Sequence, residues 1–288
     1  MSPPEMSIAA RFKEQVRQEW TAGAVAWRKW HSQFVVQTRA ATDVLVQAAQ
    51  VTPGMQVLDL ASGTGEPALT LAEAVGPTGH VTATDLVPEM LAVAEENVRQ
   101  RGLTNMAFQQ ADAEALPFAP QTFEVVTCRF GIMFCPNASQ ALGEIRRVLK
   151  PGGRAAFVVW GPFDRNPYVT STVGVFMKYV SLPPPPPDAP TPFTFAQPGT
   201  LSTAMQAAGF TQVQEETRTI PWGFPGSAAQ CWEFVREVTA PAFRRFFEAL
   251  APDQHASVIS EVLDAIKQYD DGQQVNFPAV IVVATGVR

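Results

Sequence analysis

The stretch VLDLASGTGEPALTLA, residues 57–72, joins a short apolar run to a segment with helical spacing. The apolar run reaches an acid at Asp59, and the small residues Gly63, Gly65 and Ala68 follow it. Small residues at this spacing between a strand and a helix let backbone N–H groups approach a bound cofactor closely. The stretch therefore predicts a strand, a tight loop and a helix that together form part of a cofactor site.

Strand-like and helical segments alternate after this loop. Strands are predicted over 55–61, 80–86, 106–112, 123–130 and 154–160, with helices over 67–75, from Pro88 onward, and over 138–149. Strands that are apolar on both faces and alternate with helices indicate a parallel sheet covered on both sides. Right-handed crossovers place the carboxyl ends of such strands at one edge, where these sheets bind ligands.

The segments outside this core are mostly helical and carry many aromatic residues. Apolar periodicity predicts two helices before residue 50, a helix over 166–180, a helix over 198–210 and further helices within 226–270. The prolines at 183–187 predict a stiff extended loop, and strands are expected over 211–220 and 276–288. We divide the chain into an N-terminal helical lid (1–50), a cofactor-binding core (51–161) and the remainder of the core (162–288), with cap insertions at 162–197 and 222–270.

Composition excludes several classes of protein. The net charge of −6 argues against nucleic-acid binding, and the three cysteines form no CxxC pair that would suggest a zinc site or a disulfide framework. The first 20 residues lack the apolar core of a signal peptide, and the apolar run at 279–287 is too short for a membrane-spanning helix. We expect a soluble cytoplasmic protein with no membrane span, and the oligomeric state stays open.

Three acids accompany the glycine loop, each at or near a predicted strand end. Asp85, 20 residues after Gly65, can accept hydrogen bonds from both hydroxyls of a ribose, which fits NAD and S-adenosylmethionine equally. Asp59 favours a cofactor with a cationic amino group, because a buried carboxylate would repel a pyrophosphate. Asp112 can accept from an adenine amine while the Ala113 N–H reaches a ring nitrogen. The alternatives are a loop cap for Asp59 and a solvated turn acid for Asp112.

Five segments resemble the successive motifs of class I S-adenosylmethionine-dependent methyltransferases: VLDLASGTGEPAL, TATDLVPEML, FQQADAEALPF, FEVVTCRFGIMF and EIRRVLKPGGRAAFVVW. The resemblance covers residues 40–160 most strongly. It is closest to the branch that includes the ubiquinone/menaquinone C-methyltransferases and many natural-product methyltransferases. It implies an α/β fold, a Rossmann-like doubly wound seven-stranded sheet of order 3-2-1-4-5-7-6 with the last strand antiparallel. It also implies S-adenosylmethionine as cofactor.

The same resemblance implies roles for individual residues. The loop from Ala61 through Gly63 to Gly65 would bind the methionine end, and Asp85 the ribose. The remaining predicted cofactor contacts are Leu86 and Met90 at the adenine faces, Asp112 and Ala113 at the adenine edge, and Asp59 and Arg129 at their strand ends. Two positions depart from the family pattern: a small residue replaces the third glycine, and Pro88 stands near a position that is often serine.

The methyl acceptor is predicted from the residues after the fourth strand and from the insertions. Arg129, Phe130 and Gly131 replace the Asn/Asp-Pro-Pro-Tyr motif of enzymes that methylate base or amide nitrogens, and no metal-ligand cluster is visible. The long aromatic insertions favour C- or O-methylation of a hydrophobic small molecule such as a quinone, polyketide or terpenoid. Candidate catalytic groups are His31, as a base near the cofactor, and Tyr168, at the pocket mouth; a surface histidine and a packing tyrosine are the alternatives.

Two other functions are compatible with a glycine loop of this kind. One is an NAD-dependent oxidoreductase, against which Asp59 and the LKPGG turn at 149–153 argue. The other is a non-catalytic subunit that keeps the cofactor site but blocks the acceptor pocket.

Overall fold

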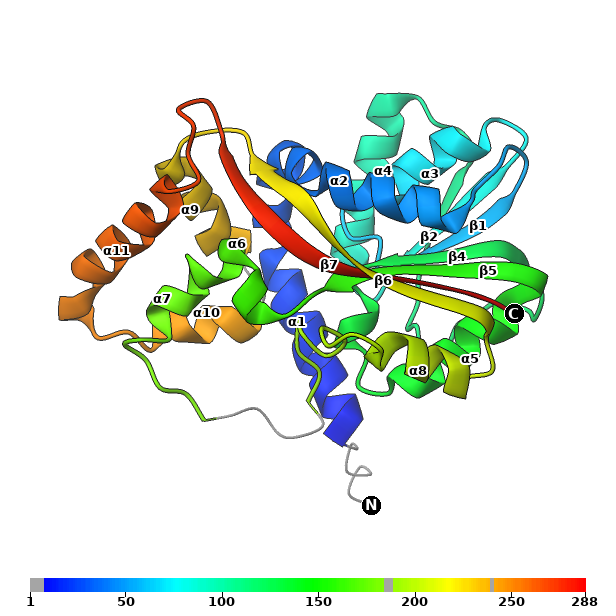
Figure 1. Cartoon of the computed structure of the whole chain (residues 1–288). Coiled ribbons are helices and arrows are strands. Elements are labelled where there is room, and N and C mark those ends of the chain that lie inside the picture. Colours follow the sequence, from blue (N-terminus) through cyan, green and yellow to red (C-terminus); the bar gives the residue numbers. More distant parts are fainter. Residues whose placement is uncertain (1–7, 184–188, 239–240) are drawn as a thin grey trace, which may run out of the picture.

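A seven-stranded sheet of order β3-β2-β1-β4-β5-β7-β6 forms the centre of the computed structural model, which describes residues 8–183, 189–238 and 241–288 (Figure 1). The pairings among β1 to β5 are parallel, and β7 is antiparallel to both of its neighbours. The predicted fold and strand order are therefore confirmed. The strands are β1 Gln56–Leu60, β2 His80–Asp85, β3 Met106–Gln110, β4 Phe123–Arg129, β5 Leu149–Trp160, β6 Thr211–Phe224 and β7 Val275–Val287.

Helices cover both faces of the sheet because successive residues of a strand point to opposite sides. Val57 and Val125 belong to one buried cluster, whereas their neighbours Leu58 and Val126 belong to another. In Figure 1, α2, α3 and α4 lie over one face, and α5 and α8 lie over the other. These helices are α2 His31–Ala49, α3 Ala68–Val75, α4 Pro88–Arg101, α5 Ala138–Val148 and α8 Thr200–Ala207.

Local sequence signals define both ends of α4, the helix that follows β2. Pro88 occupies the first turn, where its missing N–H has no partner to lose, and the helix therefore begins directly after β2. Gly102 ends the helix at φ 67°, in the left-handed region that favours glycine. Asp85, the last residue of β2, thus lies just before the first turn of α4.

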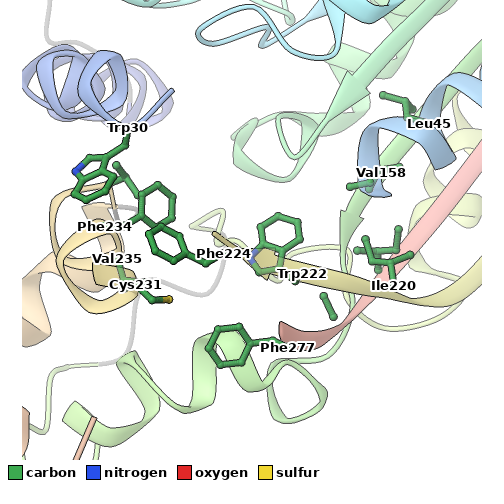
Figure 2. Packing of buried hydrophobic residues seen from close by; sticks show 14 of the residues in the cluster. Trp30, Leu45, Val158, Ile220, Trp222, Phe224, Cys231, Phe234, Val235 and Phe277 are labelled. Atoms are coloured by element: carbon green, nitrogen blue, oxygen red, sulfur yellow. The ribbon is translucent and has the colours of Figure 1, made fainter. Parts of the chain in front are cut away.

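The β6–β7 hairpin extends beyond the rest of the sheet and carries a cap of helices. Its ladder continues to Phe224 and Val275, whereas β5 pairs with β7 only as far as Trp160 and Ile281. Strand β6 is therefore longer than the predicted 211–220, because Ile220, Trp222 and Phe224 continue the inward alternation. Figure 2 shows Trp222 and Phe224 on β6, Phe277 on β7, and Phe234 on a cap helix.

The cap helices come from both predicted insertions. They are α6 Pro167–Thr170, α7 Val173–Phe176, α9 Ala228–Val238, α10 Pro241–Glu248 and α11 His255–Lys267, with 3-10 turns η2 Phe163–Arg165 and η3 Pro252–Gln254. A further 3-10 turn, η1 Ile132–Phe134, lies between β4 and α5. The single helix predicted over 166–180 is two short helices, because Thr172 leaves the helical region at φ −113° and ψ −91°. Most of the proline run predicted as a stiff loop lies outside the described residues.

The N-terminal prefix forms two helices with different surroundings. Helix α1 (Ile8–Lys29) packs against α4, α9 and α10, whereas α2 packs against β4, β5, β6 and β7. Ala41, Leu45 and Ala49 of α2 are completely or almost completely buried against the sheet. Of the two helices, α2 is therefore the one that packs extensively on the strands. Within the described ranges, no helix has both the length and the apolar character needed to span a membrane.

Candidate active site

A cavity of about 300 Å³ lies at the carboxyl ends of the parallel strands. Residues after β1, β2, β3 and β4 line one part of it, and aromatic side chains of α2, β5, β6 and the cap line the other. Helix α1 contributes Phe12, Lys13, Val16, Trp20 and Trp27 to the wall. The site therefore combines the predicted ligand edge of the sheet with the segments predicted to cover it.

The glycine loop uses its two glycines in different ways. Gly63 lines the cavity at φ 53°, and a Cβ built there would meet no atom within 4 Å. Gly65 has φ 119°, but its Cβ would lie 2.9 Å from Leu69 Cδ1, and Gly65 is absent from the described cavity wall. Gly63 thus leaves open space for a ligand, whereas Gly65 lets the loop turn closely into α3.

Asp85 connects the end of β2 to the glycine loop. Its carboxylate accepts hydrogen bonds from the backbone N–H groups of Gly63 and Val87, both at 2.9 Å. Burial raises the pKa of Asp85 above its usual range. Asp85 also lines the cavity. Because a carboxylate can accept about four hydrogen bonds, Asp85 retains the capacity to bind a ligand hydroxyl.

Asp59 lies behind the loop and is completely buried. Its carboxylate accepts hydrogen bonds from Ser62 Oγ at 2.7 Å and Thr127 Oγ1 at 2.6 Å. Burial raises the pKa of Asp59 to about 7, although these two hydrogen bonds oppose the increase. Asp59 does not line the cavity in the described structure, so its negative charge, when present, would act on a cationic ligand through the loop.

The residues predicted to contact adenine lie together at the ends of β2 and β3. Leu86, Met90, Asp112 and Ala113 all line the cavity. The Asp112 carboxylate accepts from the Glu114 N–H at 2.9 Å and forms an ion pair with Lys13 at 2.6 Å. Helix α1 is thereby tied to the predicted adenine end of the cavity.

Arg129 lines the cavity, but its guanidinium is bound to protein groups. It donates to the hydroxyl oxygens of Thr38 and Thr42 at 2.8 and 2.6 Å, and to the Glu66 carbonyl at 2.8 Å. Burial lowers the pKa of Arg129 to about 10. The side chain therefore joins α2 to the segment after the glycine loop, a role that the sequence did not indicate.

The two candidate catalytic residues have different positions. His31 lies outside the described cavity wall, its Nδ1 is 2.9 Å from Thr64 Oγ1, and burial lowers its pKa. Tyr168 lines the cavity beside Trp160, with ring centroids 6.4 Å apart, and burial raises the pKa of its hydroxyl. Tyr168 therefore stays protonated at neutral pH and can donate a hydrogen bond, but it is a poor base.

Sequence reasoning missed Lys13, Gln37 and Trp222 as residues of the site. Lys13 and Gln37 lie on α1 and α2, and Trp222 lies on the extended part of β6. For Gln37 the available signal was its helical spacing from Ala41 and Leu45 on the buried face of α2. For Lys13 the signal was its helical spacing from Val16 and Trp20, which line the cavity with it.

The residues of this site fit S-adenosylmethionine. Four carboxylates and two cationic side chains are among the lining residues, which favours a positively charged ligand. The open space at Gly63 would accept the methionine end, and the Asp85 carboxylate is available to the ribose. The described residues contain no group of three or more side chains able to hold a metal ion.

Known proteins share both this sequence pattern and this fold. The sequence profile described as the ubiE/COQ5 methyltransferase family matches residues 32–179, half of the chain. The "Ubiquinone/menaquinone biosynthesis C-methyltransferase UbiE" of Shewanella pealeana is 43% identical over 110 residues, which is 38% of this chain and 44% of that protein. Its namesake from Burkholderia cenocepacia is 40% identical over 124 residues, 42% of this chain and 51% of that protein. The chain thus matches about half the length of these curated relatives.

Solved structures with low sequence identity share the fold. The YcgJ protein of Bacillus subtilis has a TM-score of 0.55 at 20% identity, over 86% of this chain and 97% of that one. Phosphoethanolamine N-methyltransferase 2 of Haemonchus contortus, solved with S-adenosyl-L-methionine, has a TM-score of 0.55 at 16% identity, over 99% of this chain and 60% of that one.

The strand order, the glycine loop and the acids at the ends of β2 and β3 match those of the class I S-adenosylmethionine-dependent methyltransferases. The chain belongs to the ubiE/COQ5 methyltransferase family, and S-adenosylmethionine is its cofactor. Membership of this family excludes the alternative of an NAD-dependent oxidoreductase, with which the glycine loop alone is compatible.

Proposed function

We propose that this chain transfers the methyl group of S-adenosylmethionine to a carbon or oxygen atom of a hydrophobic small molecule, such as a quinone, polyketide or terpenoid. The observation that supports this most is the aromatic wall of the cavity. Phe130 and Trp160 are stacked with ring centroids 4.9 Å apart, and Trp222 lies 4.7 Å from Trp160. An aromatic wall of this kind favours a hydrophobic acceptor, and the names of the UbiE relatives support a quinone-type ring.

S-Adenosylmethionine supplies, when bound, an electrophilic methyl carbon on a positively charged sulfur. The protein's contribution is to hold the cofactor, to align the acceptor in line with the carbon–sulfur bond and to exclude water. Asp85 and the loop at Gly63 would hold the ribose and methionine parts, and Asp112 with Ala113 the adenine edge. Alignment alone can supply about 7–11 kcal/mol in favourable cases, so a catalytic triad is not required.

The surroundings of His31 and Tyr168 support different roles for them. His31 is neutral near pH 7 because burial lowers its pKa, and its bond to Thr64 holds it against the glycine loop. We propose that it positions the loop. Tyr168, protonated and next to Trp160 and Trp222, would donate a hydrogen bond to the acceptor.

The proposal is tested by incubating the purified chain with methyl-labelled S-adenosylmethionine and a panel of quinols, phenolic polyketides and terpenoids. We expect label in a product that extracts into organic solvent, together with S-adenosylhomocysteine. Asp85→Ala should weaken S-adenosylhomocysteine binding by about 1.5–3 kcal/mol and reduce turnover at limiting cofactor.

Asp253→Ala is the matched control, because Asp253 is exposed on the cap and lies outside the cavity wall. This control should leave both cofactor affinity and turnover unchanged. Label appearing only in a water-soluble amine such as phosphoethanolamine would contradict the proposed acceptor class. Intact cofactor binding with no transfer to any member of the panel would contradict it as well.

A further inference from the structure

Two residues of the cavity wall each carry a buried hydrogen-bond donor that has no partner among the described residues. Gln37 Nε2 on α2 and Trp222 Nε1 on β6 are buried atoms without a hydrogen bond to any described residue. Gln37 is 1% exposed and Trp222 is 3% exposed. Both residues line the cavity. They are the two buried side-chain atoms of the described structure that lack a partner, and the cavity is common to both.

An unpartnered buried donor costs about 1–3 kcal/mol, and buried polar groups in folded proteins therefore almost always have partners. Trp222 has little freedom to relieve this cost by moving. Its ring lies among Phe130, Trp160 and Tyr168, with centroid distances of 5.8, 4.7 and 5.8 Å. Figure 2 shows it on the extended part of β6, between Ile220 and Phe224. Gln37 is held on α2, which packs directly against β6.

The chemistry of the two groups specifies what can satisfy them. An indole N–H only donates, and the NH₂ of an amide donates as well. Tyr168 lies beside Trp222 and its protonated hydroxyl adds a third donor. The ligand atom that suits these donors is therefore a hydrogen-bond acceptor, such as a carbonyl or phenol oxygen.

The charges of the cavity wall further restrict the class of ligand that can bind. The Lys13 ammonium is ion-paired with Asp112 and Glu114, and the Arg129 guanidinium donates to Thr38, Thr42 and the Glu66 carbonyl. With four carboxylates and two cations among the described lining residues, the cavity wall disfavours a carboxylate or phosphate on the acceptor. A flat, uncharged molecule with one oxygen near its ring satisfies both the donors and the aromatic wall.

We propose that Gln37 and Trp222 form an oxygen anchor for the methyl acceptor, with the acceptor ring against Phe130 and Trp160. This inference rests on the proposed function, because it assumes that the aromatic part of the cavity receives the acceptor. An anchored oxygen fixes how the ring is turned, and so decides which ring atom faces the cofactor's methyl group. Gln37 and Trp222 are thus specificity-determining residues.

The anchor is tested with two probes of the same shape, the planar ketone indanone and its hydrocarbon counterpart indane. Their affinities for the protein saturated with S-adenosylhomocysteine are measured by calorimetry or ligand-observed NMR. We expect indanone to bind at least about tenfold more tightly, because indane leaves the donors unpaired. Gln37→Met and Trp222→Phe should each reduce this preference several-fold, mainly by weakening indanone binding.

Two matched variants separate the anchor from general packing. Gln47→Met makes the same change on the exposed face of α2. Trp30→Phe removes an indole N–H that already donates to Glu237 at 2.8 Å and lies outside the cavity wall. Both controls should leave the preference for indanone unchanged, although Trp30→Phe should lower the melting temperature.

Equal affinity for the two probes, or no binding of indanone, would overturn the inference. A preference that persists in both Gln37→Met and Trp222→Phe would overturn the assignment to these residues. Methyl transfer to the acceptor panel is measured separately. Methyl transfer without a preference for indanone would therefore reject the anchor and leave the proposed function standing. A preference for indanone without methyl transfer would reject the proposed function and leave an oxygen-binding site in the cavity.

Discussion

Gly63 and Gly65 lie two residues apart in one loop, but they have different structural roles. A side chain at Gly63 would enter the cavity, whereas a side chain at Gly65 would press on Leu69 of α3. Both have positive φ, so alanine at either position carries a conformational cost of about 1 kcal/mol. The spacing of glycines in the sequence predicted cofactor contact for both and could not separate them.

We therefore expect Gly63→Ala and Gly65→Ala to fail in different ways. Gly63→Ala should lose S-adenosylhomocysteine affinity at least about tenfold while losing only about 1 kcal/mol of stability, because its methyl group fills ligand space. Gly65→Ala should lose more stability, because Leu69 must move. Calorimetric binding and chemical denaturation of both variants measure the two effects. The same ratio of binding loss to stability loss in both would contradict this division.

The buried carboxyl group of Asp59 predicts how the stability of the folded protein depends on pH. Its folded pKa of about 7 lies above the ordinary value of 3.8, so the folded state holds the proton more tightly than the unfolded chain does. This contribution to stability is fully present below the unfolded pKa and is lost as pH rises toward and through the folded pKa. The sign follows from burial, which penalises the ionised carboxylate.

Asp59→Asn removes this titration and keeps a similar shape. The free energy of unfolding of the variant, relative to that of the natural chain, should increase by up to about 4 kcal/mol between about pH 4 and pH 8. Urea denaturation at several pH values in that range measures it. A difference between the two proteins that does not change with pH would show that Asp59 ionises normally.

Among the elements, α1 is joined to the cofactor end of the site by the partly buried cation Lys13 and by the packing of Trp20, Ala24 and Trp27 near Met90. Lys13 forms ion pairs with Asp112 and Glu114, each at 2.6 Å, and its side chain is 23% exposed. The ring contacts of Trp20 with Trp27 and with Phe134 complete the cover on the same side. Helix α1 can therefore move without disturbing the sheet, on which α2 is packed.

Lys13→Met should loosen α1 and leave the core intact. We expect faster proteolysis within residues 8–29, S-adenosylhomocysteine affinity reduced several-fold, and a change in unfolding free energy below about 1 kcal/mol. Bound S-adenosylhomocysteine should slow the proteolysis in the natural chain. Lys29→Met is the control, because Lys29 pairs with Glu237 at the opposite end of α1 and is 56% exposed. Equal proteolysis of the two variants would argue that Lys13 does not hold the helix.

At the scale of the whole molecule, the cavity joins the sheet, α1, α2 and the cap, so a ligand there should stabilise them together. S-Adenosylhomocysteine at 100 times its dissociation constant should add about 2.7 kcal/mol to the free energy of unfolding, and NAD should add nothing. Thermal melting with each compound tests this expectation. An equal increase in melting temperature with NAD would contradict the cofactor assignment.

Much of the fold could be predicted from the sequence because its signals are local. Each parallel strand is a short apolar run followed by a turn and a helix, and chain connectivity then places all the strand ends at one edge. For the same reason Gly63, Asp85 and Asp112 could be assigned to one site, although they lie at or after the ends of three different strands. The length of β6 was underestimated, since Trp222 and Phe224 are paired by β7 and the sequence of β6 alone does not show where that pairing ends.

By itself, the sequence determined the class of the sheet, the cofactor loop and the acids around it, since each follows from short local patterns and from the order of strands along the chain. Only the tertiary structure decided which side chains complete the cavity. Lys13 reaches Asp112 because α1 crosses the strand ends, and Gln37 shares a cavity with Trp222 because α2 packs on β6. Such tertiary contacts depend on how whole helices and strands pack, and that packing depends on the combined shape and burial of many residues. No short pattern around Gln37 or Trp222 encodes the other residue.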